Sequence, residues 1–151
     1  MGGSVAETLV RRYVDWIANP DAAAMEMVEI VSADFFDHVS GQVGPAIWSV
    51  VAEWSAKSFA DVDVQIHEIM TREDRVLVWF TVTGRHIGDG FPRLRGIPVT
   101  GKRVSWPQVH LFRVANERLV EHWAVRDDYA LVEAIAGGPL GGPTIAKAEA
   151  E

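Results

Sequence analysis

The sequence predicts a single α+β domain in which a strongly curved antiparallel sheet wraps around N-terminal helices and forms a cone with an apolar interior. Apolar residues recur at helical spacing as far as Asp61, and beyond it they alternate with the period of two that is typical of strands. Helices followed by strands exclude alternating βαβ units. A chain of 151 residues is long enough for one hydrophobic core and too short for two.

Three helices are expected before the sheet. The first covers residues 5–17 and stops at Asn19-Pro20. The second, capped by Asp21 and with Met25 on its apolar face, is expected to end near residues 32–34. The third opens at Gly44-Pro45, because proline suits the first turn of a helix.

Four strands are expected to follow, at residues 62–70, 75–85, 102–114 and 118–126. Short turns join the first to the second and the third to the fourth, which favours antiparallel hairpins. Asp127 or Asp128 is expected to cap a final helix that ends at Ala136. Residues 137–151, rich in glycine, proline, alanine and glutamate, are predicted to be a flexible tail behind a single domain of residues 1–136.

Composition excludes several classes of partner. The formal charge of −7 opposes binding to nucleic acid, and no apolar run approaches the ~20 residues of a membrane-spanning helix. The first residues lack the basic segment and apolar core of a secretion signal, so a cytoplasmic location is expected. Cysteine is absent and the histidines are scattered without metal-ligand spacing, so no metal site is predicted.

Three stretches resemble one known family. Residues 84–86 and 96–102 are similar to its Gly-x-His and Gly-x-Pro-x-Thr-Gly-Lys pattern, residues 108–114 form the second stretch, and residues 119–123 with Asp127 form the third. The family is that of the SnoaL-like polyketide cyclases, in the nuclear transport factor two-like superfamily, and the resemblance covers roughly residues 5–136. It implies a cone-shaped α+β fold. Family members that are enzymes close rings by intramolecular aldol condensation, without a cofactor, using a cavity histidine and aspartate.

The resemblance carries over only in part. His110 matches the family histidine, whereas the position of the family aspartate is occupied by Ala124. If the chain closes rings, another acid must serve, and Asp127 is the nearest candidate in the sequence.

Strand parity predicts which polar side chains meet, since residues two apart on a strand share a face. Trp106, Gln108 and His110 share one face, and His122 shares another with Arg126. Imidazole, with an unperturbed pKa of about 6.5, suits proton abstraction next to carbonyl groups. The resemblance also implies polar residues at the pocket mouth. The candidate catalytic residues are therefore His110, Asp127 and His122, and the candidate substrate-binding residues are Asp37, His38, Trp106, Gln108 and Arg126.

Alternatives stay open at this point. His110 could be a buried structural histidine, and Asp127 could be only a helix cap. The predicted function is a cofactor-independent cyclase or isomerase that acts on a polyketide-like or other carbonyl-rich small molecule. The rivals are a non-catalytic ligand-binding or assembly domain, and an epoxide hydrolase built on Arg126, Asp127 and Asp37. Both faces of strand 75–85 carry apolar bulk, which favours a homodimer.

Overall fold

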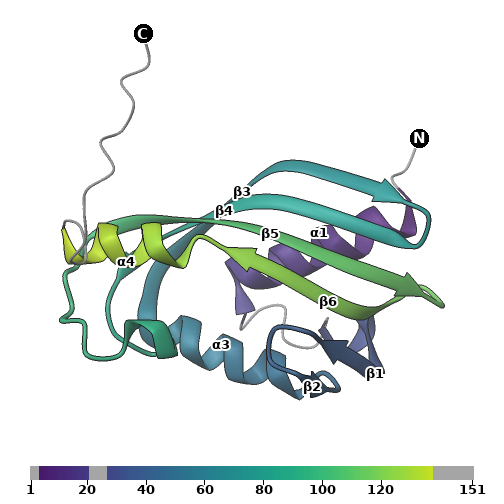
Figure 1. The fold of residues 1–151 in the computed structure, drawn as a ribbon, viewed down its shortest axis with the longest axis horizontal. Coiled ribbons are helices and arrows are strands. Elements are labelled where there is room, and N and C mark those ends of the chain that lie inside the picture. Colours follow the sequence, from purple (N-terminus) through teal and green to yellow (C-terminus); the bar gives the residue numbers. More distant parts are fainter. Residues whose placement is uncertain (1–3, 21–26, 138–151) are drawn as a thin grey trace, which may run out of the picture.

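The computed structural model describes residues 4–20 and 27–137, and it confirms the α+β class with a curved sheet around helices. Helices α1 and α3 lie on the concave side of the sheet, and α4 lies at one end of it (Figure 1). The elements are α1 (Val5–Ala18), β1 (Val31–Asp37), β2 (Gln42–Val43), α3 (Ala46–Ser58), β3 (Phe59–Arg72), β4 (Arg75–His86), the short 3-10 helix η1 (Pro92–Leu94), β5 (Arg103–Ala115), β6 (Arg118–Arg126) and α4 (Asp128–Ala136).

Local sequence explains where the helices begin. Ser4 caps α1 by accepting a hydrogen bond from the Glu7 amide at 3.1 Å, and Asp127 caps α4 by accepting one from the Ala130 amide at 3.0 Å. Residues 27–30 are helical, but the predicted Asp21 cap, Met25 and the predicted tail at residues 138–151 lie outside the described residues.

The sheet has six strands in the order β2-β1-β6-β5-β4-β3 and is not closed. Strands β3 to β6 form the expected antiparallel meander, whereas β1 pairs in parallel with β6. The prediction that residues 32–34 end a helix was therefore wrong, and β1 and β2 join the four expected antiparallel strands, β1 by a parallel pairing. The seven residues of β1 are too few to establish a clear period, and the backbone partners of β1 come from the far end of the chain.

The sheet curves because several pairings are interrupted. Register shifts occur twice between β3 and β4 and once between β5 and β6, and such bulges bend and twist strands. The inner face of β4 is buried at Val76, Val78, Phe80 and Val82, while Trp79 on the outer face is 48% exposed. The core therefore lies between the concave face and the helices.

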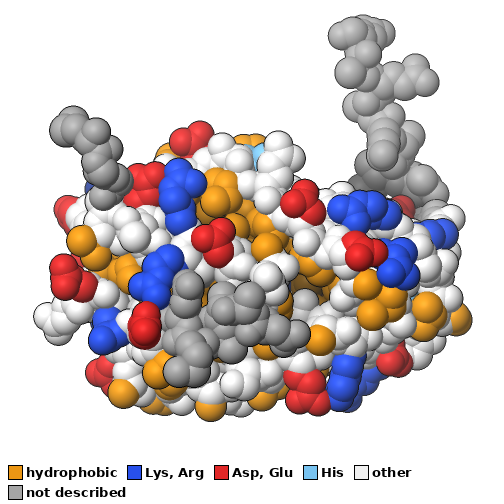
Figure 2. All heavy atoms as spheres, turned by 180° about the vertical axis from the view of Figure 1, so that it is seen from behind, with side chains coloured by type: hydrophobic (Ala, Val, Ile, Leu, Met, Phe, Trp, Pro, Cys, Tyr) orange, Lys and Arg blue, Asp and Glu red, His pale blue; other side chains and the backbone are white. Residues whose placement is uncertain are grey.

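The face opposite to that of Figure 1 is hollowed near its centre (Figure 2). Hydrophobic side chains gather around this hollow, and acidic and basic side chains are interspersed beyond it. No helix among the described residues is long and apolar enough to cross a membrane.

Candidate active site

A cavity of about 320 Å³ lies between α1, α3, the η1 loop and the inner face of the sheet. Its wall is mainly aromatic and aliphatic, with a few polar side chains, which is the usual character of a small-molecule site. The aromatic lining residues are Tyr13, Trp16, Trp48, Trp54, Phe59, Phe91 and Trp106. The polar lining includes Asp37, Gln108, His110, His122 and Arg126.

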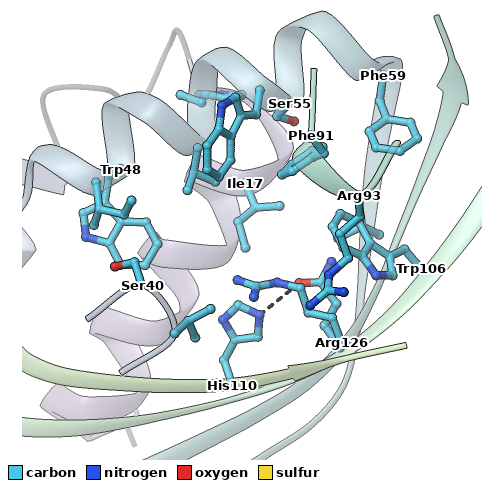
Figure 3. A pocket seen from close by; sticks show the side chains of 18 of the residues that line it. Ile17, Ser40, Trp48, Ser55, Phe59, Phe91, Arg93, Trp106, His110 and Arg126 are labelled. Carbon is cyan, nitrogen blue, oxygen red and sulfur yellow. Dashed lines mark hydrogen bonds between the residues drawn. The ribbon is translucent and has the colours of Figure 1, made fainter. Parts of the chain in front are cut away.

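Strands β5 and β6 position most of the polar groups. On β5, Trp106, Gln108 and His110 are all buried on one face, as alternation predicts. In the antiparallel register Gln108 lies opposite Arg126, and His110 lies opposite Ala124. Side chains of the two strands therefore enter the cavity side by side (Figure 3).

The buried polar side chains form a continuous hydrogen-bonded array. His122 Nδ1 lies 2.9 Å from Asp37 Oδ1, and His122 Nε2 lies 2.8 Å from His110 Nδ1. His110 Nε2 lies 2.9 Å from Gln108 Oε1, the contact drawn in Figure 3. The hydroxyl of Tyr13, from α1, lies 3.0 Å from His110 Nδ1. Elements from both ends of the chain thus meet at His110.

The array holds Asp37 as a carboxylate. Burial raises the pKa of this carboxyl group, but hydrogen bonds from His122, Ser40 and the Val39 amide outweigh burial and bring the pKa to about 2. Because a carboxylate only accepts hydrogen bonds, the proton on the facing His122 nitrogen is fixed at Nδ1.

Both imidazoles are kept neutral near pH 7. Burial lowers the pKa of His110 well below its ordinary value, and positive charge at His122 and Arg126 acts in the same direction. Burial also lowers the pKa of His122, opposed by the hydrogen bond and charge of Asp37. A neutral imidazole has one unprotonated ring nitrogen, so His110 can accept a proton.

The hydrogen-bond pattern accommodates one additional proton. Asp37 and Gln108 Oε1 both accept, which requires hydrogens on His122 Nδ1 and His110 Nε2, and the contact between the two rings needs a third. Two neutral imidazoles carry only two ring hydrogens. The resting state would require the Gln108 amide to turn and donate to Nε2 of His110, a hydrogen bond that is given up when Nε2 takes a proton; the structure has the amide oxygen facing Nε2, as the protonated state requires. The array therefore suits both states of a base.

At the mouth of the cavity, Asp128 at the start of α4 joins three elements. It accepts a hydrogen bond from Trp106 Nε1 at 3.2 Å and pairs with Arg93 Nε at 2.5 Å. Arg93 belongs to the η1 loop, so these contacts tie that loop to β5 and α4.

The structure brings together six of the eight predicted site residues: His110, His122, Asp37, Trp106, Gln108 and Arg126. The other two lie elsewhere, which corrects the expectation that they face the pocket. Asp127 is exposed and its carboxylate caps α4. His38 is exposed, stacks on Trp123 at 4.3 Å between ring centroids and hydrogen-bonds to Glu121. The Arg126, Asp127 and Asp37 set of an epoxide hydrolase is therefore not assembled.

Sequence reasoning missed Tyr13 and the contact between Asp37 and His122. A tyrosine on the apolar face of an amphipathic helix is a usable signal, because a buried hydroxyl usually finds a partner. Within the described ranges, no group of three or more histidine, aspartate or glutamate side chains is arranged to hold a metal ion.

Comparison with known proteins agrees with this fold. The family model of the SnoaL-like polyketide cyclases matches residues 7–135, and the chain belongs to that family. The aklanonic acid methyl ester cyclase DnrD of Streptomyces peucetius is 28% identical over 119 residues, which are 76% of this chain and 79% of that protein. The nogalonic acid methyl ester cyclase of Streptomyces nogalater is 30% identical over 81 residues, 52% of this chain and 57% of that protein.

Solved structures show the same architecture. The crystal structure of AclR from Streptomyces galilaeus superposes with a TM-score of 0.74 at 30% sequence identity, covering 90% of this chain and all of that one.

Proposed function

We propose that the protein is a cyclase that closes a ring in a polyketide-like, carbonyl-rich small molecule by intramolecular aldol chemistry, with His110 as the base. The observation that carries the proposal is a buried imidazole, that of His110, 1% exposed, at the wall of an apolar cavity and hydrogen-bonded through His122 to Asp37. Two of the relatives named above are cyclases of aklanonic acid methyl ester and nogalonic acid methyl ester, which agrees with this substrate class.

The reaction consists only of proton transfers and the formation of one carbon–carbon bond. His110 Nε2 removes a proton from a carbon that lies between two carbonyl groups, and the electron pair moves onto a carbonyl oxygen. The enolate carbon then attacks a second carbonyl carbon of the same molecule. The resulting alkoxide takes the proton back from His110 Nε2. Since His110 serves as base and then as acid, neither a cofactor nor a carboxylate at position 124 is required.

The surrounding residues support each step. The new proton on His110 is stabilised by Gln108 Oε1 on one side and by His122 and Asp37 on the other. Trp48, Phe91 and Trp106 exclude water and supply flat surfaces for a planar substrate.

The test is turnover of a β-polyketo ester, followed as loss of the open-chain ester and appearance of the ring. Proton transfer by a positioned base contributes roughly 100-fold or more, so His110→Ala and His110→Asn should lose at least that factor in kcat. His67→Ala is the matched control, because His67 is exposed and bonded to Thr81 outside the cavity. Equal rates in a folded His110→Asn protein would remove His110 from the mechanism.

A second candidate is a non-catalytic binding domain, and Ala124 in the position of the family aspartate favours it. In that case the ester would bind saturably, detected through the tryptophans that line the cavity, while neither the wild type nor any variant would turn it over.

A homodimer also fits the outer face of the sheet. Trp79 is 48% exposed and Val125 is 76% exposed, and a second copy would cover them. Analytical ultracentrifugation of the wild type and of Trp79→Lys tests this: a dimer that becomes a monomer supports it, and a monomeric wild type contradicts it.

A further inference from the structure

We infer that Arg126 binds the enolate oxygen that forms when His110 takes the proton, and that the substrate enters this part of the cavity as an uncharged 1,3-dicarbonyl group. The inference rests on the proposed function and deepens it, because it assigns a catalytic residue and the charge state of the substrate.

The first support is position. Arg126 is the last residue of β6 and lies opposite Gln108, one inward-facing pair along the two strands from His110. Its side chain extends from the strand into the cavity on the side of His110 (Figure 3). An oxygen that is held by this guanidinium would therefore lie beside His110 Nε2, where the carbon acid must be.

The second support is that Arg126 has no hydrogen bond or ion pair with any described residue, although the cavity wall includes two carboxylates. Asp37 is occupied by His122, Ser40 and the Val39 amide. Asp128 is occupied by Trp106 and Arg93. Ala124, the inward-facing neighbour of Arg126 on β6, carries only a methyl group. A cation without a partner among the described residues, in a largely apolar cavity, is suited to negative charge on the ligand.

The third support is electrostatic. The charge of Arg126 acts to lower the pKa of Tyr13, His110 and His122, which agrees with its place beside them in the strand register and the cavity wall. A fixed donor in a site that excludes water stabilises charge that develops during the reaction more strongly than water does.

The same position disfavours a substrate that already carries a carboxylate there. Such a group would occupy Arg126 before the reaction and place a second negative charge beside the developing enolate, which like-charge repulsion opposes. An uncharged β-keto ester or β-diketone leaves Arg126 free for the oxygen that becomes negative.

The atoms balance without a further reactant. The carbon–hydrogen bond breaks and its proton goes to His110 Nε2, while its electron pair forms the enolate whose oxygen faces Arg126. The carbon–carbon bond then forms, the negative charge moves to the attacked carbonyl oxygen, and that oxygen takes the proton from His110.

Benzoylacetone, a 1,3-diketone whose enolate absorbs at longer wavelength than its neutral forms, tests the inference directly. We expect its pKa to fall by at least one unit when it is bound to the wild type, measured by absorbance across pH. Arg126→Met should abolish the fall and Arg126→Lys should retain part of it. Arg95→Met, an exposed arginine outside the cavity wall, should behave as the wild type. An unchanged fall in folded Arg126→Met would overturn the inference, as would a benzoate that binds through Arg126 more tightly than the diketone.

Turnover separates this inference from the proposed function. Loss of one preorganised donor costs roughly 100-fold or more in kcat, so Arg126→Met should lose about that factor on a β-polyketo ester while KM changes less. If His110→Asn is inactive and Arg126→Met keeps its kcat, the cyclase proposal stands and the role of Arg126 falls. If neither variant changes kcat, both fall.

Discussion

His122 Nδ1 lies 2.9 Å from Asp37 Oδ1, although 85 positions separate the two residues in the sequence. The parallel pairing of β1 with β6 places them opposite each other, and the His38 amide donates to the His122 carbonyl oxygen at 2.9 Å. The hydrogen bond between His122 Nδ1 and Asp37 fixes the orientation of the His122 ring. Through His122 it also determines which nitrogen His110 presents to the cavity.

Replacement of Asp37 by asparagine should lower the basicity of His110 while it keeps a hydrogen-bond acceptor for His122. The amide keeps an acceptor for His122, but it loses the charge and places its NH₂ group among donors from Ser40 and Val39. We expect kcat to fall by roughly 100-fold. Because a neighbouring negative charge is lost, the acid limb of the pH–rate profile should move to lower pH.

Asp34→Asn is the matched control for that variant, since Asp34 is exposed on the same strand. A profile that shifts equally in both variants would contradict a specific role for Asp37.

Insertion of a carboxylate through Ala124→Asp should pair with Arg126 and stand next to His110. A nearby negative charge raises the pKa of an imidazole, so the acid limb should move to higher pH, and turnover should fall because Arg126 is occupied. Ala124→Asn, of equal size and no charge, should leave the limb in place. Faster turnover in Ala124→Asp with an unchanged acid limb of the pH–rate profile would contradict this prediction. It would mean that the wild type lacks the family aspartate and has no other group in its place.

Tyr13→Phe removes the hydroxyl group beside His110 Nδ1 and leaves the ring packing against Trp48 and Phe112 intact. Loss of one buried hydrogen bond should lower the free energy of unfolding by about 1 kcal/mol, measured with urea. Tyr129→Phe, at a residue that is 61% exposed, should change it little. Equal stability of the Tyr13 and Tyr129 variants would show that the hydroxyl contact contributes nothing.

Stability should decrease as the pH falls. The folded state lowers the pKa of both His110 and His122, so below about pH 6.5 the unfolded chain binds protons that the folded protein does not. The free energy of unfolding should then fall by up to about 1.4 kcal/mol per pH unit for each histidine. Asp37, with its pKa lowered from 3.8 to about 2, adds a further loss below about pH 4.

Urea unfolding at pH 8, 7, 6 and 5 measures this slope. His110→Gln should flatten it and His67→Gln should not, because His67 is exposed. A stability that is constant from pH 8 to pH 5 would refute burial of the neutral pair.

The sequence predicted the features that follow from short-range periodicity. Alternation along β5 placed Trp106, Gln108 and His110 on one face, since a pleated strand turns every second side chain the same way, and the family resemblance of His110 pointed that face toward the cavity. The same reasoning placed His122 on the inner face of β6. This reasoning failed for β1, whose hydrogen bonds come from a strand far along the chain. It also failed for His38, which comes directly after β1 and is exposed.

Two polar roles were decided by tertiary structure alone. Asp127, the candidate acid three residues after the family position, accepts a hydrogen bond from an amide of α4, while Asp37 reaches the histidine pair. The pattern of residues by itself determined the fold class and which side chains share a strand face, because both depend on neighbours within a few positions, while the family resemblance indicated which face enters the cavity. Only the folded chain decided that Asp37, Tyr13 and Arg126 surround the two histidines, because distant segments meet where long-range strand pairing and core packing bring them.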